Sequence, residues 1–396
     1  MRRPIRLIAT AVAGLMALPG CQTVPFRSDP RGGGAVLGLG GPAPYLSPRP
    51  TALSPRPTAP KPPPARLEVA DPNPDVYAAT RTGMFSRAVH DLPARVYVPN
   101  GASGTVDVID PATYAIVGHF TVGRAPQHIA PSWDLGTLWL SEADGLVPVD
   151  PRTGRPGAVR RMAGADNFYF TPDGRYTLVM SGQRVDVRYS RTLRLQASIP
   201  MPCKGVNSAD FTADGTQVLV SCELDGQLVR LDPAQGKVTG VLGLRRGALP
   251  QDVRLSPDGA VFYVSDMAAG GVWVVDAVRL RRLGFVRTGK GAHGLYPSRD
   301  GKLLYVANRG EGTISLISFA TRAAAGKWRL PGGSPDMGGV SADGSVLWLS
   351  GRYDGSVYAI STVDGRLLRR IRVGRGPHGL CVYPQPGRYS IGPILR

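Results

Sequence analysis

From residue 94 onward, short runs of Val, Ile, Leu, Tyr and Trp alternate with polar turns. Seven turns end in a glycine, and successive glycines are 38, 41, 44, 42, 43 and 43 residues apart: Gly136, Gly174, Gly215, Gly259, Gly301, Gly344 and Gly387. Most of these turns contain Asp-Gly, which supplies the left-handed backbone of a tight hairpin. The pattern predicts a region built from structural repeats of about 40 residues.

Each repeat contains four segments with the composition of β-strands. The segment after each of the first six turns is the most regular: Thr137–Ser141, Tyr176–Ser181, Gln217–Ser221, Val261–Ser265, Leu303–Ala307 and Val346–Ser350. Two more segments follow, such as 271–276 and 283–288, and a fourth, such as 252–255, precedes the next turn. Four short strands per repeat are typical of the blades of an all-β propeller.

The two ends of the repeat region predict how the ring closes. The first strand, Arg95–Val98, has no partner directly upstream, and the last, His378–Val382, has no blade after it. If these strands complete one shared blade, the chain forms seven blades and exposes no sheet edge. We therefore expect a seven-bladed β-propeller over residues 94–390, closed by pairing of its N- and C-terminal strands, with a tail at 391–396.

Several repeats resemble those of the YVTN family of bacterial and archaeal surface propellers, which are WD40-like. The resemblance is carried by 95–100 with 104–110, by 303–308 with 312–317, and by the blade link at 374–380. It covers residues 94–387 and implies the fold, whereas its motifs say little about function. Relatives include periplasmic proteins of the YncE type, and similar propellers include lactonase-like enzymes and haem d1-binding domains.

The N-terminal region has the features of an exported lipoprotein. Arg2, Arg3 and Arg6 precede a twelve-residue apolar run at 7–18, which is too short to span a bilayer and typical of a signal peptide. The segment ending in Cys21 resembles the bacterial lipobox, which implies that residues 1–20 are removed and Cys21 is lipidated. Ordinary secretory cleavage nearby is the alternative. Under both alternatives we expect an extracytoplasmic protein. Lipidation of Cys21 would in addition anchor it to the periplasmic or cell-surface face of a bacterial membrane.

A proline-rich segment follows the anchor. Of the 54 residues from 22 to 75, fourteen are proline, which favours extended polyproline conformations and prevents formation of a core. We expect residues 21–75 to act as a spacer between the lipid and the propeller. Residues 76–93 form a short lead-in whose apolar side chains could make a short helix at the edge of the domain.

Polar residues recur eight positions before each turn glycine, near the start of the inner strand. Inner strands line the channel of a propeller, so their first residues meet at one mouth. These residues are His128, Asp166, Asn207, Gln251, His293, Asp336 and, through its Pro-His-Gly motif, His378. The ring could hold a metal, bind a polar ligand or surround water. We expect no cofactor, with zinc, copper or iron at His128, His293 and His378 as the open alternative.

Basic residues recur on the same side of the ring. The loops that precede the inner strands, called the mouth loops below, carry Arg124, Lys204, Arg246, Lys290 and Arg375. The loops between second and third strands add Arg309 and Arg352, together with several acids. With a formal net charge of +18, this arrangement favours anionic ligands or polymers. Asp252, next to Gln251, is a further candidate because its carboxylate could act with His293 or His378.

Four cysteines are present, without a C-x-x-C motif. Cys203 falls in a mouth loop and Cys222 follows the second strand of the same blade, so we expect a disulfide between them. Two buried thiols are the alternative. Cys381 falls within a strand and is expected to be a small core residue.

No Gly-x-Ser-x-Gly or His-Glu-x-x-His motif is present. We therefore expect a monomeric cell-envelope lipoprotein whose propeller is a binding or interaction module, with its ligand at the channel mouth. The expected partners are an envelope protein, a cell-wall polymer or an anionic small ligand. The alternatives are a lactonase-like hydrolase or another metal-dependent enzyme, and a nucleic-acid-binding protein like YncE.

Overall fold

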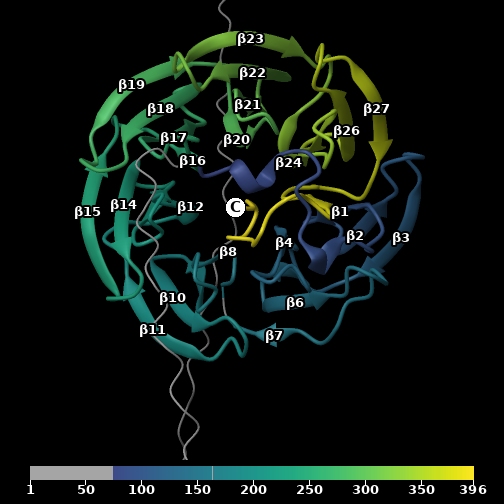
Figure 1. Cartoon of the computed structure of the whole chain (residues 1–396), viewed down its shortest axis with the longest axis horizontal. Coiled ribbons are helices and arrows are strands. Elements are labelled where there is room, and N and C mark those ends of the chain that lie inside the picture. The colour runs from purple at the N-terminus through teal and green to yellow at the C-terminus, as the bar shows by residue number, and fades with distance from the viewer. Residues whose placement is uncertain (1–74, 163) are drawn as a thin grey trace, which may run out of the picture. The chain divides into compact units, whose positions relative to one another are not determined.

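The computed structural model describes residues 75–162 and 164–396, which form seven four-stranded antiparallel sheets arranged as a ring (Figure 1). The predicted seven-bladed propeller is confirmed. The predicted signal peptide, the lipidated Cys21 and nearly all of the spacer lie outside the described residues. No helix in the described part of the chain is long and apolar enough to cross a membrane.

We number the sheets as blades 1 to 7 in chain order, and give the strands of each from the channel outward. Blade 1 contains β28 (Cys381–Tyr383), β1 (Arg95–Asn100), β2 (Thr105–Ile109) and β3 (Ile116–Thr121); blade 2 contains β4 (Ile129–Pro131), β5 (Leu138–Glu142), β6 (Gly145–Val149) and β7 (Arg160–Arg161); blade 3 contains β8 (Asn167–Phe170), β9 (Tyr176–Ser181), β10 (Arg184–Tyr189) and β11 (Leu195–Pro200); blade 4 contains β12 (Val206–Phe211), β13 (Val218–Cys222), β14 (Gln227–Asp232) and β15 (Lys237–Gly243). Blade 5 contains β16 (Pro250–Leu255), β17 (Val261–Asp266), β18 (Gly271–Asp276) and β19 (Arg282–Arg287); blade 6 contains β20 (Ala292–Pro297), β21 (Leu303–Asn308), β22 (Thr313–Ser318) and β23 (Ala323–Arg329); blade 7 contains β24 (Pro335–Val340), β25 (Val346–Gly351), β26 (Ser356–Ser361) and β27 (Leu367–Arg372).

Burial falls from the middle of each blade to its outer strand. Every residue of β17 is buried, whereas most residues of β19 in the same blade are exposed. The middle strands are buried on both faces because each blade packs between two neighbours, and such strands read as continuous apolar runs. The core therefore lies between the blades and not inside any one of them.

The Asp-Gly turns have the geometry that their sequence predicts. In the turn of blade 4, Thr212 Oγ1 donates to Asp214 Oδ1 at 2.5 Å, and the Gly215 amide donates to the Thr212 carbonyl at 2.9 Å. Gly215 has φ +70°, a left-handed conformation that glycine adopts without steric cost. In blades 2 to 7 the turns join the first two strands, on the side of the ring opposite the mouth loops, called the turn side below.

The ring closes through the two ends of the repeat region. Strand β28 pairs with β1 in antiparallel register, with Arg95 opposite Tyr383 and Tyr97 opposite Cys381. This confirms the predicted closure of the ring by its N- and C-terminal strands. Cys381 is a buried free thiol in this strand, and burial raises its pKa to about 12.

The lead-in differs from the expected helix at the domain edge. It contains two short 3₁₀ turns, η1 (Ala78–Thr80) and η2 (Arg87–Val89), and it crosses the turn side of blades 5 to 7. The Val76 amide donates to the Pro257 carbonyl at 2.9 Å, and Arg81 Nη1 donates to the Arg299 carbonyl at 3.1 Å. The segment is held by the turns it crosses because they present free carbonyl groups.

The last residues are a plug rather than a free tail. Ile391, Ile394, Leu395 and Arg396 are buried, and the C-terminal end lies near the centre of the ring (Figure 1). Arg396 Nη2 is 2.6 Å from Asp210 Oδ1 in β12, a buried ion pair. The tail predicted at 391–396 therefore fills the channel on the turn side.

Candidate functional site

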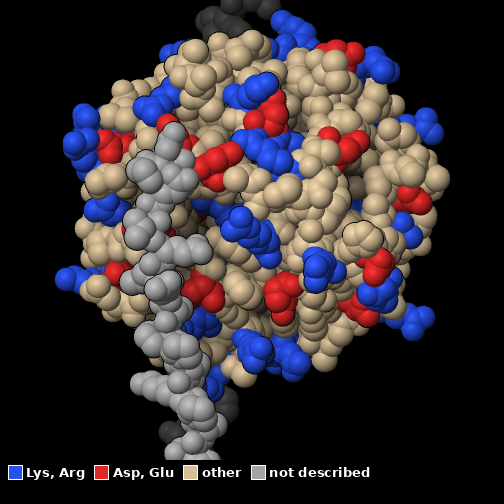
Figure 2. Space-filling model, in the orientation of Figure 1, with Lys and Arg blue, Asp and Glu red and all other residues tan. Residues whose placement is uncertain are grey.

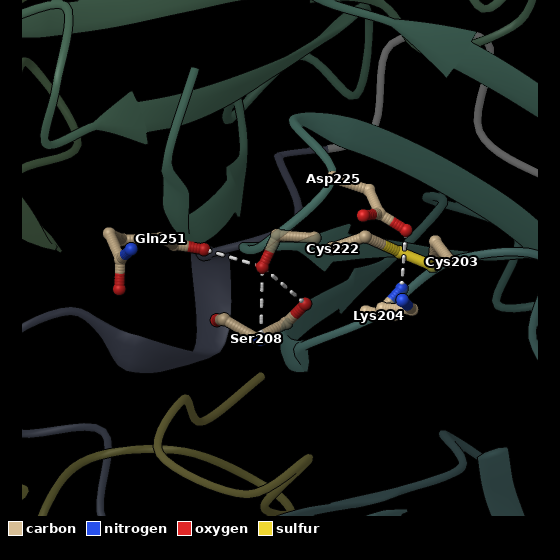
Figure 3. The surroundings of a disulfide bond; sticks show 7 residues. Cys203, Lys204, Ser208, Cys222, Asp225 and Gln251 are labelled. Carbon is tan, nitrogen blue, oxygen red and sulfur yellow. Dashed lines mark hydrogen bonds between the residues drawn. A yellow bond between two sulfur atoms is a disulfide. The ribbon is translucent and has the colours of Figure 1, made fainter. Parts of the chain in front are cut away.

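A repeated serine fixes the inner strands at the channel mouth. In blade 4, Ser221 Oγ accepts from the Ser208 amide at 3.0 Å and donates to the carbonyl of Gln251, in blade 5, at 2.7 Å (Figure 3). Ser141 connects the His128 amide (3.1 Å) to the Asp166 carbonyl (2.7 Å) in the same way. The hydroxyl of such a serine links neighbouring blades directly beneath the mouth residues. These serine hydroxyls bind the backbone amides and carbonyls at the start of the inner strands, and they thereby fix the positions of the mouth residues.

Two of the seven ring residues lie against a third, Asp336, and a fourth, His128, packs beside them. His378 Nδ1 lies 2.7 Å from Asp336 Oδ2, and His293 Nδ1 lies 3.3 Å from Asp336 Oδ1. The His378 ring is 4.8 Å from that of His128 and 5.6 Å from that of His293, measured between centroids. Blades 1, 2, 6 and 7 therefore each contribute one residue to a single cluster.

Arg309 completes the surroundings of Asp336. Its Nη1 lies 3.3 Å from Asp336 Oδ1, and its Nη2 lies 2.8 Å from Met267 Sδ. The guanidinium also lies 5.6 Å from the ring centroid of Tyr353, whose side chain is 72% exposed. The carboxylate of Asp336, which is fully buried, is therefore balanced by a buried cation. The repeat pattern does not predict Met267 or Tyr353 as site residues. Each lies in a loop between second and third strands, and neither residue type recurs at the equivalent position of the other blades.

The pKa shifts follow from burial and this pairing. Burial alone would raise the pKa of Asp336, but His293, His378 and Arg309 hold it well below the usual range. Burial lowers the pKa of His293 to about 3, against the attraction of Asp336, and Arg309 lowers it further. Burial also lowers the pKa of His128 well below its ordinary value. Near neutral pH the cluster thus holds an ionised carboxylate and uncharged His128 and His293.

The other ring residues lie on the remaining part of the mouth. Asn207 Nδ2 donates to Gln251 Oε1 at 3.2 Å and lies 3.5 Å from Glu223 Oε2. Asp166 is exposed at the rim, yet the surrounding protein excludes enough water to raise its pKa, an effect opposed by His378 and Arg352. All seven positions predicted from the repeat register therefore face one mouth.

Asp252 does not belong to the mouth. It is 2% exposed, and its Oδ1 lies 2.8 Å from Arg254 Nη1 and accepts from Ser208 Oγ at 2.8 Å. Its Oδ2 accepts from the Leu295 amide at 3.0 Å. Asp252 lies one residue further along the inner strand than Gln251, which turns its carboxylate toward the interior. The suggestion that Asp252 acts with His293 or His378 is corrected: their carboxylate is Asp336.

The predicted basic residues separate into two groups. Those of the mouth loops are exposed at the rim: Arg124, Lys204, Arg246, Lys290 and Arg375. Arg124 pairs with Asp144 at 3.1 Å. Of the predicted basic residues, Arg309 contacts the cluster through Asp336, and Arg352 acts on His128 and His293 through its charge. Figure 2 shows one face of the molecule, on which acidic and basic side chains are interspersed.

Cys203 and Cys222 are joined by a disulfide between the mouth loop and the end of β13, with their Cα atoms 6.0 Å apart (Figure 3). Beside it, the Lys204 amide donates to Asp225 Oδ2 at 2.8 Å. Both sulfur-bearing residues are buried. The bond therefore fixes the loop that leads to Asn207.

The space available at the mouth is shallow. Below the cluster, a channel cavity of about 20 Å³, lined by His128, Arg254 and Tyr296, has room for about one water molecule. A larger cavity of about 290 Å³ lies between blades 1 and 2. There His119 is already paired with Asp107 at 2.6 Å. A ligand of the cluster would lie on the mouth and not inside the channel.

Within residues 75–162 and 164–396, no group of three or more His, Cys, Asp or Glu side chains is arranged to hold a metal ion. Two of the imidazoles direct Nδ1 at Asp336. This leaves Nε2 of His293 and His378, together with the His128 ring, as the imidazole nitrogens of the cluster that can meet a ligand. A carboxylate that accepts from Nδ1 fixes the tautomer and orientation of an imidazole.

Fold and site together define a seven-bladed propeller with a polar cluster at one mouth. The profile of the YNCE-like beta-propeller family matches residues 241–387, as the repeats predicted. No curated protein matches the chain.

Three solved structures share the fold. A functionally unknown protein from Desulfotomaculum acetoxidans is 15% identical, with a TM-score of 0.62 over 73% of this chain and 98% of that one. Hydrazine synthase from Kuenenia stuttgartiensis is 16% identical, with a TM-score of 0.59 over 70% and 98%. The dihydro-haem d1 dehydrogenase NirN in complex with DHE is 14% identical, with a TM-score of 0.57 over 78% of each chain. At these identities the likeness concerns the fold alone.

Proposed function

We propose that the protein is an extracytoplasmic binding module whose propeller takes a small polar ligand at the channel mouth. The observation that carries the proposal is the pairing of His293 and His378 with Asp336 at that mouth, with the His128 ring packed against His378. Four blades each provide one of these residues, and the turn side of the channel is filled by the C-terminal residues. Polar groups held in fixed positions around a concave surface are the usual basis of ligand specificity.

The cellular setting follows from the sequence. A lipid on Cys21 would hold the chain at a bacterial membrane, and the proline-rich segment at 21–75 would separate the propeller from it. The Cys203–Cys222 disulfide is in keeping with this setting, since such bonds persist mainly outside the cytoplasm.

Native mass spectrometry of the full chain, purified from its envelope in non-denaturing detergent, tests the proposal. We expect an added ligand mass on the wild-type chain that is lost in His378→Asn and retained in His90→Asn, whose side chain is exposed. A wild-type chain that stays bare after incubation with envelope extract would contradict the proposal. Elemental analysis of the same sample, prepared without chelator or His tag, distinguishes an organic ligand from zinc, copper or iron.

A hydrolase is the second candidate, favoured by the pairing of His378 with Asp336. An imidazole that donates Nδ1–H to a buried carboxylate presents Nε2 as a base, as in the catalytic triads of hydrolases. Hydrolysis of a lactone panel that disappears in both His378→Asn and Asp336→Asn would support this function. Equal rates in wild type and both variants would exclude a role for the pair.

A further inference from the structure

The mouth contains two arginines at the cluster, and they differ in their partners. Arg309 is paired with Asp336 at 3.3 Å, and its side chain is 10% exposed. Arg352, at the equivalent loop of the next blade, makes no ion pair within the described residues, and its Nη1 is buried without a hydrogen-bond partner. A buried donor without a partner is costly, and native proteins retain such groups mainly where a ligand or water completes them.

Arg352 lies in the loop after β25, on the mouth side of the channel, and its buried Nη1 faces the interior of this side. Its backbone amide donates to the Ser334 carbonyl at 3.2 Å, which fixes the start of the loop. After the larger effect of burial, its charge further lowers the pKa of His128 and of His293, and it opposes the raised pKa of Asp166. These three residues belong to blades 2, 6 and 3, so the guanidinium lies within electrostatic reach of several sides of the ring.

We propose that the mouth binds an oxyanion, carboxylate or phosphate, with Arg352 as the anchor and His128 as a flanking hydrogen-bond donor. This inference rests on the proposed function and names the chemical class of its ligand. A guanidinium offers a planar pair of N–H groups that matches two oxygens of a carboxylate or phosphate. The single N–H of the uncharged His128 imidazole can donate to the same group.

The charges around the cluster favour an anion over a cation. The negative charge of Asp336 is opposed by the paired Arg309, and its Oδ2 is hydrogen-bonded to His378, whereas its Oδ1 makes no hydrogen bond. A cationic ligand would be repelled by the charge of Arg352, which has no ion-pair partner among the described residues. The exposed basic residues of the mouth loops, Lys290 and Arg375 among them, would also attract an anion toward the mouth. Asp166 is the competing internal anion, because its charge lies near Arg352.

The test measures binding of inorganic phosphate and of succinate to the full chain by calorimetry, at constant ionic strength. We expect Arg352→Gln to weaken binding at least tenfold, Arg352→Lys to restore part of it, and Asp166→Asn to strengthen it. Arg369→Gln is the matched control, since Arg369 is exposed on outer strand β27, and it should change the affinity less than twofold. Thermal unfolding followed by circular dichroism checks that every variant is folded.

The outcomes separate the two proposals. Binding of phosphate alone assigns a phosphorylated ligand, and binding of succinate alone assigns a carboxylate. If a natural ligand is lost in His378→Asn but unaffected by Arg352→Gln, the binding function stands and the oxyanion site is wrong. The oxyanion site is also wrong if neither probe binds the wild-type chain at millimolar concentration. A wild-type chain that binds neither probe and captures no ligand from envelope extract contradicts both.

Discussion

His378 and Asp336 lie 42 residues apart and on different blades, yet His378 Nδ1 is 2.7 Å from Asp336 Oδ2. His378 directly precedes β28, the strand that closes the ring, whereas Asp336 belongs to β24 in the last complete blade. The contact therefore crosses the boundary between blades 7 and 1. It joins the closure of the fold to the polar cluster at the mouth.

Removing the charge of Asp336 should destabilise the propeller. Asp336→Asn would leave Arg309 buried without a counter-charge, and loss of one partner from a buried pair costs about 3 kcal/mol or more. Urea unfolding followed by tryptophan fluorescence measures the difference. Asp364→Asn, in an exposed turn, should change the free energy of unfolding by about 0.5 kcal/mol or less. Equal stability of the two variants would show that the pairing of Asp336 contributes nothing.

The lowered pKa values of His128 and His293 predict a loss of stability in acid. Both histidines take up protons more readily when unfolded, so their contribution is complete above pH about 6.5 and decreases as the pH falls. For His293 the decrease continues toward its folded pKa of about 3. The slope amounts to about 1.4 kcal/mol per pH unit for each histidine.

Substitution of one histidine tests this pH dependence. We expect His293→Asn to flatten the curve of unfolding free energy against pH between pH 6 and about 4.5, by about one proton. The exposed His90 provides the control, and His90→Asn should leave the slope unchanged. Parallel curves for His293→Asn and wild type would contradict the prediction.

Loss of the disulfide should weaken the fold near Asn207. Cys203 and Cys222 are 19 residues apart, and a loop of this size corresponds to about 3 kcal/mol of chain entropy. Reduction should therefore lower the midpoint of urea unfolding, and a Cys203→Ser, Cys222→Ser double variant should match the reduced protein. Cys381→Ala keeps the disulfide and should stay sensitive to reductant. A double variant that is still destabilised by reductant would contradict the assignment.

The buried ion pair of the C-terminal plug should contribute to the stability of the propeller as much as a buried contact between two blades does. Arg396→Ala leaves Asp210 buried without its cation, and we expect the free energy of unfolding to fall by about 3 kcal/mol. Arg388→Ala removes an exposed arginine of the same segment, and it should have little effect. Comparable losses in the two variants, measured by chemical unfolding, would show that burial of Arg396 is not what stabilises the tail.

The sequence was most informative where structure is local. The number of blades follows from the spacing of the turn glycines, and the closure of the ring follows from the two unpaired terminal strands. Both can be predicted because each blade contacts only the blades next to it. The mouth ring followed from register alone. Strand alternation already separates Asp252 from the ring, because Asp252 follows Gln251 by one residue whereas Asp336 shares the register of Gln251. Which ring residues pair with Asp336 depends on contacts between blades. The difference between Arg309 and Arg352 depends on side-chain contacts across blades, and repeat spacing does not encode these.

The position of β28 also determines when the site can exist. The strand and the preceding His378 come from the end of the chain, but they complete the blade that begins at Arg95. During folding, the N-terminal blades can form while the cluster still lacks His378 and Asp336 lacks its closest imidazole. The cluster is complete only when β28 has paired with β1. An assembled mouth therefore reports that the ring has closed.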